Sequence, residues 1–250
     1  MEHNNEHKVF FMGIEVSPFT YEQLHETIRK VIENRGSFKI FNVNIHAINL
    51  CFKNRTFFNS MREADYVFCD GEGVRQAMHY YGDRVPYRIT YADWVEIFFP
   101  WLSEKGYSIA FLGANPDILE KAVQKVRQQY PDLRLTGVVD GYLPETEQLT
   151  KLQNIRADIL LVGMGMPMQE LWICRNQRKL PFSIYLSGGA VFDYLSQEIS
   201  RAPVWMRNWG MEWFYRFILE PRRMFVRYIL GNPLFAARVL LSKKPFDNRL

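Results

Sequence analysis

The 250-residue chain is 48% hydrophobic and 23% charged, a composition that fits one globular α/β domain or a domain with an appendage. No apolar run reaches the roughly 18 residues that a membrane-spanning helix needs, and residues 1–8 are polar, so we expect no signal peptide. Cys51, Cys69 and Cys174 lie far apart, without CxxC spacing or an even number, which favours a reducing cytoplasm over a disulfide framework.

The net charge of +4 is distributed unevenly along the chain. Residues 201–250 hold ten Arg and Lys against three Asp and Glu, whereas residues 1–200 hold slightly more acidic than basic side chains. We therefore predict two parts, an α/β domain over residues 1–200 and a basic, aromatic-rich appendage over residues 201–250. The acidic balance of the larger part argues against nucleic acid as a partner.

Short apolar segments alternate with longer amphipathic ones from residue 9 to residue 187. Strands are expected at residues 9–13, 38–43, 66–69, 107–112, 133–138, 158–162 and 182–186. Helices are expected after the capping residue Thr20, at residues 45–61, from about residue 73, at residues 92–104, 116–129 and 145–154, and up to about residue 179. This alternation predicts a parallel sheet with helices on both faces.

One acidic residue stands at the end of a predicted strand. The segment Tyr66–Cys69 is followed by Asp70, and Gly71 then breaks the strand. In open α/β sheets ligands bind beyond the carboxyl ends of the strands, and an ionised carboxylate there can accept a proton from a substrate hydroxyl. The alternative is that Asp70 merely caps the next helix, since Asp before Gly is common in turns.

Glycines follow most of the other predicted strands. They are Gly113, Gly141, Gly163, Gly165, Gly188 and Gly189. Glycines at strand ends let the backbone approach a ligand, and helix N-termini after such loops favour anions. Each of these glycines taken singly is equally compatible with an ordinary turn.

Several familiar signatures are missing from the sequence. It contains neither GxGxxG nor GxxxxGK[ST], which argues against a dinucleotide dehydrogenase and a P-loop enzyme. It also lacks HExxH, Asp-x-Asp and a Cys/His ligand cluster; Asp70-Gly71-Glu72 is the nearest approach to a metal-binding carboxylate pair. We therefore expect neither a metal site nor a cofactor.

The basic appendage has two rows of residues at helical spacing. Aromatic residues recur every four positions at Trp205, Trp209, Trp213 and Phe217. Charged residues recur at Arg216, Glu220, Arg223 and Arg227, with Pro221 expected to kink the helix, and Lys243 and Lys244 follow. An aromatic and basic helix suits the surface of a membrane with anionic lipids. The alternative is that the tryptophan ridge packs in a core.

Taken together and in this order, several motifs resemble the WecG/TagA/CpsF family of bacterial glycosyltransferases. They are Asp70-Gly71, Arg88 to Asp93, Phe111-Leu112-Gly113, residues 162–170, Gly188-Gly189 with Phe192-Asp193, Arg201-Ala202-Pro203, and residues 212–216 followed by 220–223. The match runs from about residue 9 to residue 230, which is nearly the whole chain.

The resemblance implies a Rossmann-like α/β catalytic domain, followed by an appendage that meets the inner face of the bacterial cytoplasmic membrane. It also implies an activity: transfer of a sugar from a UDP-sugar to a polyprenyl-diphosphate-linked saccharide, inverting the anomeric centre without a metal. Such enzymes build surface polymers such as exopolysaccharide, capsule or the linkage unit of teichoic acid. A homo-oligomer is compatible with the sequence.

The same resemblance implies roles for individual residues. Asp70 would be the general base, and Asn44 would help to position the substrate. The nucleotide-sugar would be held by Arg88, Gly113, Gly163, Gly165, Gln169 and Asp193. The diphosphate would be held by Arg216, Arg223 and Arg227.

Three positions depart from the family pattern. Asn42 stands where some relatives have threonine, Tyr91 replaces a glycine, and Met168 stands where lysine is usual. None of them is the expected base. Two other classes of protein remain open at this point: a non-catalytic membrane module that holds a nucleotide-sugar, and a nucleotide-dependent oxidoreductase.

Overall fold

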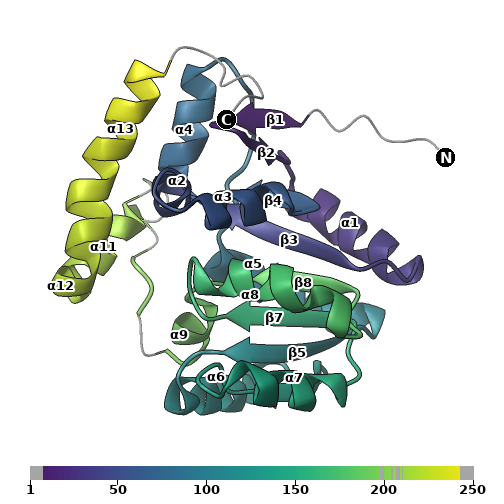
Figure 1. The fold of residues 1–250 in the computed structure, drawn as a ribbon. Helices are drawn as coiled ribbons and strands as arrows, with labels where there is room; N and C mark the ends of the chain where they lie inside the picture. The colour runs from purple at the N-terminus through teal and green to yellow at the C-terminus, as the bar shows by residue number, and fades with distance from the viewer. Residues whose placement is uncertain (1–7, 198–199, 204, 207–208, 210, 243–250) are drawn as a thin grey trace.

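A computed structural model describes residues 8–197, 200–203, 205–206, 209 and 211–242 of the chain. Its centre is a six-stranded sheet in the order β4-β3-β8-β7-β5-β6, in which all neighbouring strands run parallel (Figure 1). The strands are β3 (Phe38–Val43), β4 (Tyr66–Cys69), β5 (Ser108–Gly113), β6 (Arg134–Val139), β7 (Ile159–Gly163) and β8 (Ile184–Ser187). All six carboxyl ends therefore lie along one edge of the sheet, and the predicted α/β fold is confirmed.

Helices cover both faces of this sheet, because successive side chains of a strand point to opposite faces. In β7, Leu160 and Val162 belong to one buried cluster, and Ile159 and Leu161 belong to the other. The domain's helices are α1 (Tyr21–Glu33), α2 (Ile45–Cys51), α3 (Arg55–Arg62), α4 (Glu72–Tyr80), α5 (Tyr91–Lys105), α6 (Pro116–Gln129), α7 (Glu145–Gln153), α8 (Met168–Asn176), the 3₁₀ turn η1 (Gln177–Lys179) and α9 (Val191–Leu195). The continuous apolar character of the strands reflects burial on both sides.

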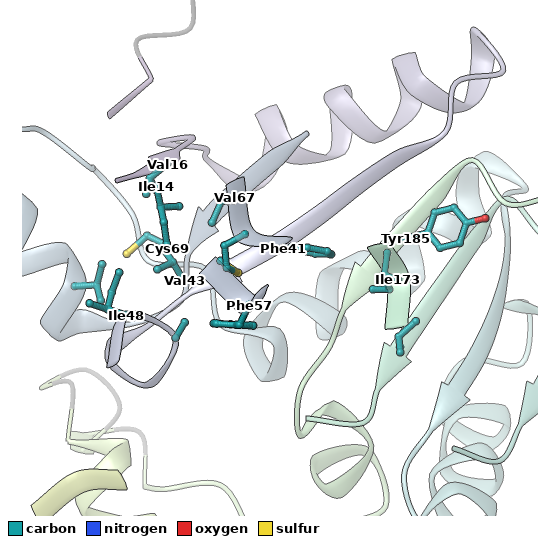
Figure 2. Packing of buried hydrophobic residues seen from close by; sticks show 14 of the residues in the cluster. Ile14, Val16, Phe41, Val43, Ile48, Phe57, Val67, Cys69, Ile173 and Tyr185 are labelled. Carbon is teal, nitrogen blue, oxygen red and sulfur yellow. The ribbon is translucent and has the colours of Figure 1, made fainter. Parts of the chain in front are cut away.

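The first cluster extends from the sheet into a small hairpin at the N-terminal end. The hairpin consists of β1 (Val9–Phe11) and β2 (Ile14–Val16). Ile14 and Val16 are buried in the same cluster as Phe41 of β3 (Figure 2). The prediction of one strand over residues 9–13 is wrong, because Met12 and Gly13 have φ of 47° and 81° and turn the chain back.

Five of the described α-helices, α1, α2, α3, α5 and α6, begin at a residue whose side chain caps the helix. Thr20 caps α1, as the sequence predicts, and the structure adds that Gln23 completes a reciprocal capping box with it. The predicted helix over residues 45–61 is interrupted, however. Asn54 accepts a hydrogen bond from the Phe57 N–H at 3.0 Å and starts a second helix, α3.

The appendage from Glu212 to Leu241 is helical in four segments, of which the last three follow one another without a break. They are α11 (Glu212–Leu219), α12 (Pro221–Met224), the π-helical segment η2 (Phe225–Leu230) and α13 (Gly231–Leu241). Trp209 lies in a turn before α11 begins, so the expectation that the four aromatic residues share one helix is wrong. Pro221 starts a new helix, as its missing N–H allows, instead of kinking a continuous one.

Helix α13 docks on the α/β domain beside α2 and α4 (Figure 1). Phe235 and Val239 of α13 are buried in the first hydrophobic cluster. The Tyr81 hydroxyl donates to the Val239 carbonyl at 2.8 Å, and the Asn49 amide donates to the Gly231 carbonyl at 2.8 Å. The last helix is therefore held to the domain by both apolar and polar contacts.

The appendage, α13 included, also exposes many apolar side chains. They include Trp205, Trp209, Trp213, Phe214, Ile218, Leu219, Phe225, Val226, Ile229, Leu230, Leu240 and Leu241. Within the described part of the chain, no helix is both long enough and apolar enough to cross a membrane. The exposed tryptophans are inconsistent with the alternative in which the ridge fills a core.

Candidate functional site

A cleft of about 1500 Å³ lies between the carboxyl ends of the strands and the appendage. The domain contributes strand-end loops and the starts of α2, α4 and α5, and the appendage contributes α11, η2 and α13. Of the predicted site residues, the cleft is lined by Asn44, Asp70, Arg88, Gly163, Gly165, Asp193, Arg216 and Arg227. These residues come from most of the length of the chain.

Asp70 lies at the edge of the cleft, where β4 ends. Its Oδ2 accepts a hydrogen bond from the Asn42 side-chain amide at 2.6 Å. Gly71, not Asp70, is the N-cap residue of α4, and no side chain caps this helix. The structure therefore does not support the alternative in which Asp70 serves only as a helix cap.

Asn42, which donates to Asp70, is buried in β3 and is itself oriented by a further hydrogen bond. Its Oδ1 accepts a hydrogen bond from the Ser187 hydroxyl at 3.2 Å. Ser187 is the last residue of β8, so three neighbouring strands contribute to one chain of hydrogen bonds. Since Asn42 uses its oxygen toward Ser187, its NH₂ group is aimed at Asp70.

Asn44 lies next to this carboxylate because two helix starts meet. Its Oδ1 accepts from the Ala47 N–H at 3.0 Å and caps α2. A Cβ on Gly71 would lie 3.2 Å from the Asn44 Cβ, and a Cβ on Gly73 would lie 2.5 Å from Ile45 Cδ1. The glycines that follow Asp70 thus allow α2 and α4 to begin side by side.

The glycine loops form a closely packed backbone floor. A Cβ on Gly113 would lie 2.5 Å from the Gly163 carbonyl oxygen, and one on Gly141 would lie 2.6 Å from the Gly113 Cα. Gly163 lines the cleft, whereas Gly113 is not among the residues that line it. Gly113 therefore supports the floor from behind.

Gln169 is also behind the floor. Its side chain is fully buried and does not line the cleft. Its Oε1 accepts hydrogen bonds from the backbone N–H groups of Gly165 at 3.2 Å and Gly189 at 2.9 Å. Asp193, by contrast, lines the cleft from α9.

The arginines approach the cleft from two directions. Arg88 comes from the loop before α5, while Arg216 and Arg227 come from α11 and η2 of the appendage. Arg216 is 7% exposed, with its guanidinium 5.2 Å from the Tyr194 ring and 3.4 Å from the Glu220 carboxylate. The side chain of Arg223 lies outside the described part of the structure. The described arginines give the cleft positive charge on both walls.

A buried polar cluster adjoins the site, and only parts of it were evident from the sequence. Glu170 is fully buried, and burial raises its pKa to about 7. Tyr91, one of the departures from the family pattern, is buried too, and burial followed by the Asp70 charge raises its pKa well above the ordinary value. Ser187 lies near both side chains and lowers the pKa of each. The feature of the sequence that pointed to this cluster was a polar residue within an otherwise apolar strand, such as Asn42 or Ser187.

The carboxylates show no arrangement for a metal. In the described residues there is no group of three His, Cys, Asp or Glu side chains close enough to hold an ion. Glu72 is instead paired with Arg75, whose Nη2 donates to it at 2.6 Å, and with Gln76 at 3.1 Å. Asp70 and Glu72 therefore have different partners: Asp70 accepts from Asn42, whereas Glu72 accepts from Arg75 and Gln76.

Known proteins resemble this chain over most of its length. The model of the family described as "Glycosyl transferase WecG/TagA/CpsF family" matches residues 9–249. An N-acetylglucosaminyldiphosphoundecaprenol N-acetyl-beta-D-mannosaminyltransferase of Bacillus subtilis (strain 168) is 29% identical over 206 residues, 82% of this chain and 80% of that protein. A protein of the same name from Staphylococcus aureus (strain NCTC 8325 / PS 47) is 23% identical over 248 residues, 97% of this chain and 96% of that one.

Replacing Glu170 by Gln should make the protein relatively more stable as the pH rises. The folded-state pKa of Glu170 is raised from 4.5 to about 7, so its contribution to stability is complete below pH 4.5 and is lost as pH rises through 7. The free energy of unfolding of Glu170→Gln, relative to the wild type, should therefore increase by about 2 kcal/mol between pH 5 and pH 8.

Urea unfolding of both proteins at the two pH values measures this change. His25 and His46, whose pKa values burial lowers to about 4, titrate in both proteins, so their effects cancel in the difference. An equal difference between the two proteins at both pH values would show that Glu170 titrates normally.

Proposed function

Because this chain belongs to the WecG/TagA/CpsF family of glycosyltransferases, we propose that it transfers a sugar from a UDP-sugar to a polyprenyl-diphosphate-linked saccharide, with inversion and without a metal. The observation that carries the proposal is the position of Asp70, oriented by Asn42 at the end of β4, in a cleft whose walls carry arginines. The product would serve the assembly of a bacterial surface polysaccharide.

Asp70 is suited to act as the general base. An acceptor hydroxyl has a pKa far above 7, so it needs a carboxylate in line with it as its oxygen attacks the anomeric carbon. The new C–O bond forms on the face opposite the leaving UDP, the bond to the diphosphate breaks, and the proton moves to Asp70. Asn44, next to Asp70, would orient the acceptor or the donor sugar.

The leaving diphosphate would be stabilised by the arginines. Arg88, Arg216 and Arg227 line the same cleft from its two walls. A guanidinium offers paired N–H donors that match phosphate oxygens, and it keeps its charge at every physiological pH. Three such groups can neutralise the charge that develops on UDP, which is the role a metal has in other transferases.

The names of the relatives indicate the class of acceptor. Both relatives described above are named for transfer of N-acetylmannosamine to N-acetylglucosaminyl-diphospho-undecaprenol. We extend to this chain the polyprenyl-diphosphate-linked acceptor and a donor in the UDP-hexose or UDP-N-acetylhexosamine class. Tyr91 and Met168 depart from the family pattern and line the cleft, so these two side chains would help to determine which sugar the enzyme accepts.

We further propose that the appendage attaches the enzyme to an anionic membrane surface. Ile218, Phe225 and Ile229 are exposed and do not line the cleft, so they are available to contact lipid. The surrounding basic residues would add attraction of about 1 kcal/mol each near anionic headgroups. Attachment of this kind would bring the cleft to a substrate whose lipid part stays in the bilayer.

Asp70→Asn should lower kcat by about 10²–10⁴ while leaving the fold intact, because the change is nearly isosteric and removes only the base. Sugar transfer from radiolabelled UDP-sugar to a synthetic polyprenyl-diphosphate-sugar measures the loss. Asp140→Asn is the matched control: Asp140 follows β6 but does not line the cleft, and asparagine can still accept from the Tyr142 N–H. If Asp70→Asn turns over normally while UDP binding is unchanged, Asp70 is not the base. A wild type that binds UDP but transfers no sugar would favour the non-catalytic module.

Arg216→Ala and Arg227→Ala should each lower kcat/KM roughly ten- to a hundred-fold on a short, water-soluble acceptor, since each guanidinium forms charged hydrogen bonds to phosphate. The assay contains EDTA, and wild-type turnover should persist in it. Arg222→Ala changes an exposed residue of α12 that does not line the cleft; it is the control and should be neutral. Normal turnover by both cleft variants would contradict the role of the arginines, and rescue only by added Mg²⁺ or Mn²⁺ would contradict metal independence.

The double variant Ile218→Ser with Phe225→Ser should bind anionic liposomes several-fold more weakly, because it removes exposed apolar surface from the appendage. Turnover on the short soluble acceptor should be unchanged. Val138→Ser alters an exposed apolar residue on the edge strand β6 and should bind liposomes like the wild type. Co-sedimentation at low and high salt measures binding, and an intact protein that ignores anionic liposomes at low salt would overturn this proposal.

A further inference from the structure

One buried oxygen atom holds two of the loops that line the cleft. The Oε1 of Gln169 accepts hydrogen bonds from the N–H of Gly165, in the loop after β7, and from the N–H of Gly189, in the loop after β8. Both loops contribute backbone to the cleft. The separation of the two loops at this point is therefore set by a side chain that does not line the cleft.

These contacts require one orientation of the Gln169 amide. Its oxygen must face the two backbone N–H groups, so its NH₂ group must find an acceptor within the protein interior. Glu170 supplies that acceptor: Gln169 Nε2 donates to Glu170 Oε1 at 2.7 Å. If the acceptor were missing, the NH₂ group would remain buried without a partner, and the amide would lose its preferred orientation.

The loops held in this way have backbone that is suited to close contact with a ligand. Gly165 and Gly189 have φ of 78° and 60°, in the left-handed region that favours glycine. A Cβ on either would meet no atom within 4 Å, so both face open space. Asp193, in the helix after the second loop, also lines the cleft.

Glu170 also lies near the chain of hydrogen bonds that reaches the base. Its carboxyl is close enough to Ser187 for that hydroxyl to lower its pKa, and Ser187 donates to Asn42, which donates to Asp70. Glu170 Oε2 has no hydrogen-bond partner in the described part of the chain, although it is fully buried. A buried carboxyl with an unpaired oxygen is costly to retain for packing alone, which points to a role in the site.

We propose that Gln169 and Glu170 are positioning residues: Glu170 fixes the amide of Gln169, and Gln169 fixes the distance between the two glycine loops that receive the nucleotide-sugar. This inference rests on the proposed function, because it assigns the loops to the donor. It differs from the role implied by the resemblance, in which Gln169 holds the nucleotide itself. Neither side chain touches the donor.

The test compares three variants by the binding of UDP and by transfer kinetics. Glu170→Leu removes the acceptor and should weaken UDP binding about tenfold, raise KM for the UDP-sugar by a similar factor, and change kcat less than threefold. Glu170→Gln keeps an acceptor oxygen and should restore both values to those of the wild type. Gln169→Leu, which releases both loops, should weaken UDP binding at least as much as Glu170→Leu.

The matched control is Asn176→Leu at the other end of α8. Asn176 is equally buried, and its amide donates to Glu145 and to the Trp172 carbonyl, away from the cleft. This variant should lose stability but bind UDP normally, which separates positioning from a general structural role. Isothermal titration with UDP gives the affinities, and urea unfolding gives the stabilities.

The outcomes distinguish this inference from the proposed function. A wild type that binds no UDP overturns the proposed donor. A wild type that binds UDP, together with Glu170→Leu that binds it equally well, overturns the positioning role alone. If Glu170→Gln is as impaired as Glu170→Leu, an acceptor oxygen is not what Glu170 supplies, and the inference is again overturned.

Discussion

The hydrogen bond from Asn42 to Asp70 depends on the parallel pairing of β3 with β4. In this register Val43 lies beside Cys69, so Asn42 is one residue short of the strand end, where its amide can reach the carboxylate that follows β4. Because β8 pairs with the other side of β3, Ser187 reaches Asn42 from the opposite direction. A shift of register by one residue would turn Asn42 to the other face of the sheet and leave Asp70 without this donor.

This arrangement places polar groups in an interior that is otherwise apolar, which has a cost in stability. Asn42 and Ser187 offset that cost because Ser187 donates a hydrogen bond to Asn42, and Asn42 donates one to Asp70. Tyr91 and Glu170 do so less completely, since in the described part of the chain the Tyr91 hydroxyl and Glu170 Oε2 have no hydrogen-bond partner. A sequence selected for stability alone would fill these positions with apolar side chains. Their presence beside Asp70 is consistent with an interior shaped around the chemistry at the strand ends.

The sequence predicted well those features that depend on local signals. The α/β alternation, the cap at Thr20 and the position of Asp70 at a strand end all follow from spacing within a few residues. The hairpin at residues 9–16 was missed because a two-residue turn without Asn-Gly resembles the middle of a strand. The place of Gln169 behind the loops could not be predicted, since a residue that follows a strand-end loop can face the ligand or the interior, and only the packing of α8 against the sheet decides which.

The appendage gives the cleft its second wall, and the way it is attached bears on how the site works. Helix α13 is fixed to the domain by Phe235 and by the hydrogen bonds from Tyr81 and Asn49, whereas η2, which carries Arg227, has no buried residue. Arg216 is steadied from the domain side by the ring of Tyr194. The helical segments that carry Arg216 and Arg227 are therefore attached to the domain at two places, through α13 and through the Tyr194 ring. The same segments also expose apolar side chains to their surroundings. The exposed apolar side chains and the two cleft arginines, Arg216 and Arg227, are thus carried by the same helical segments of the appendage.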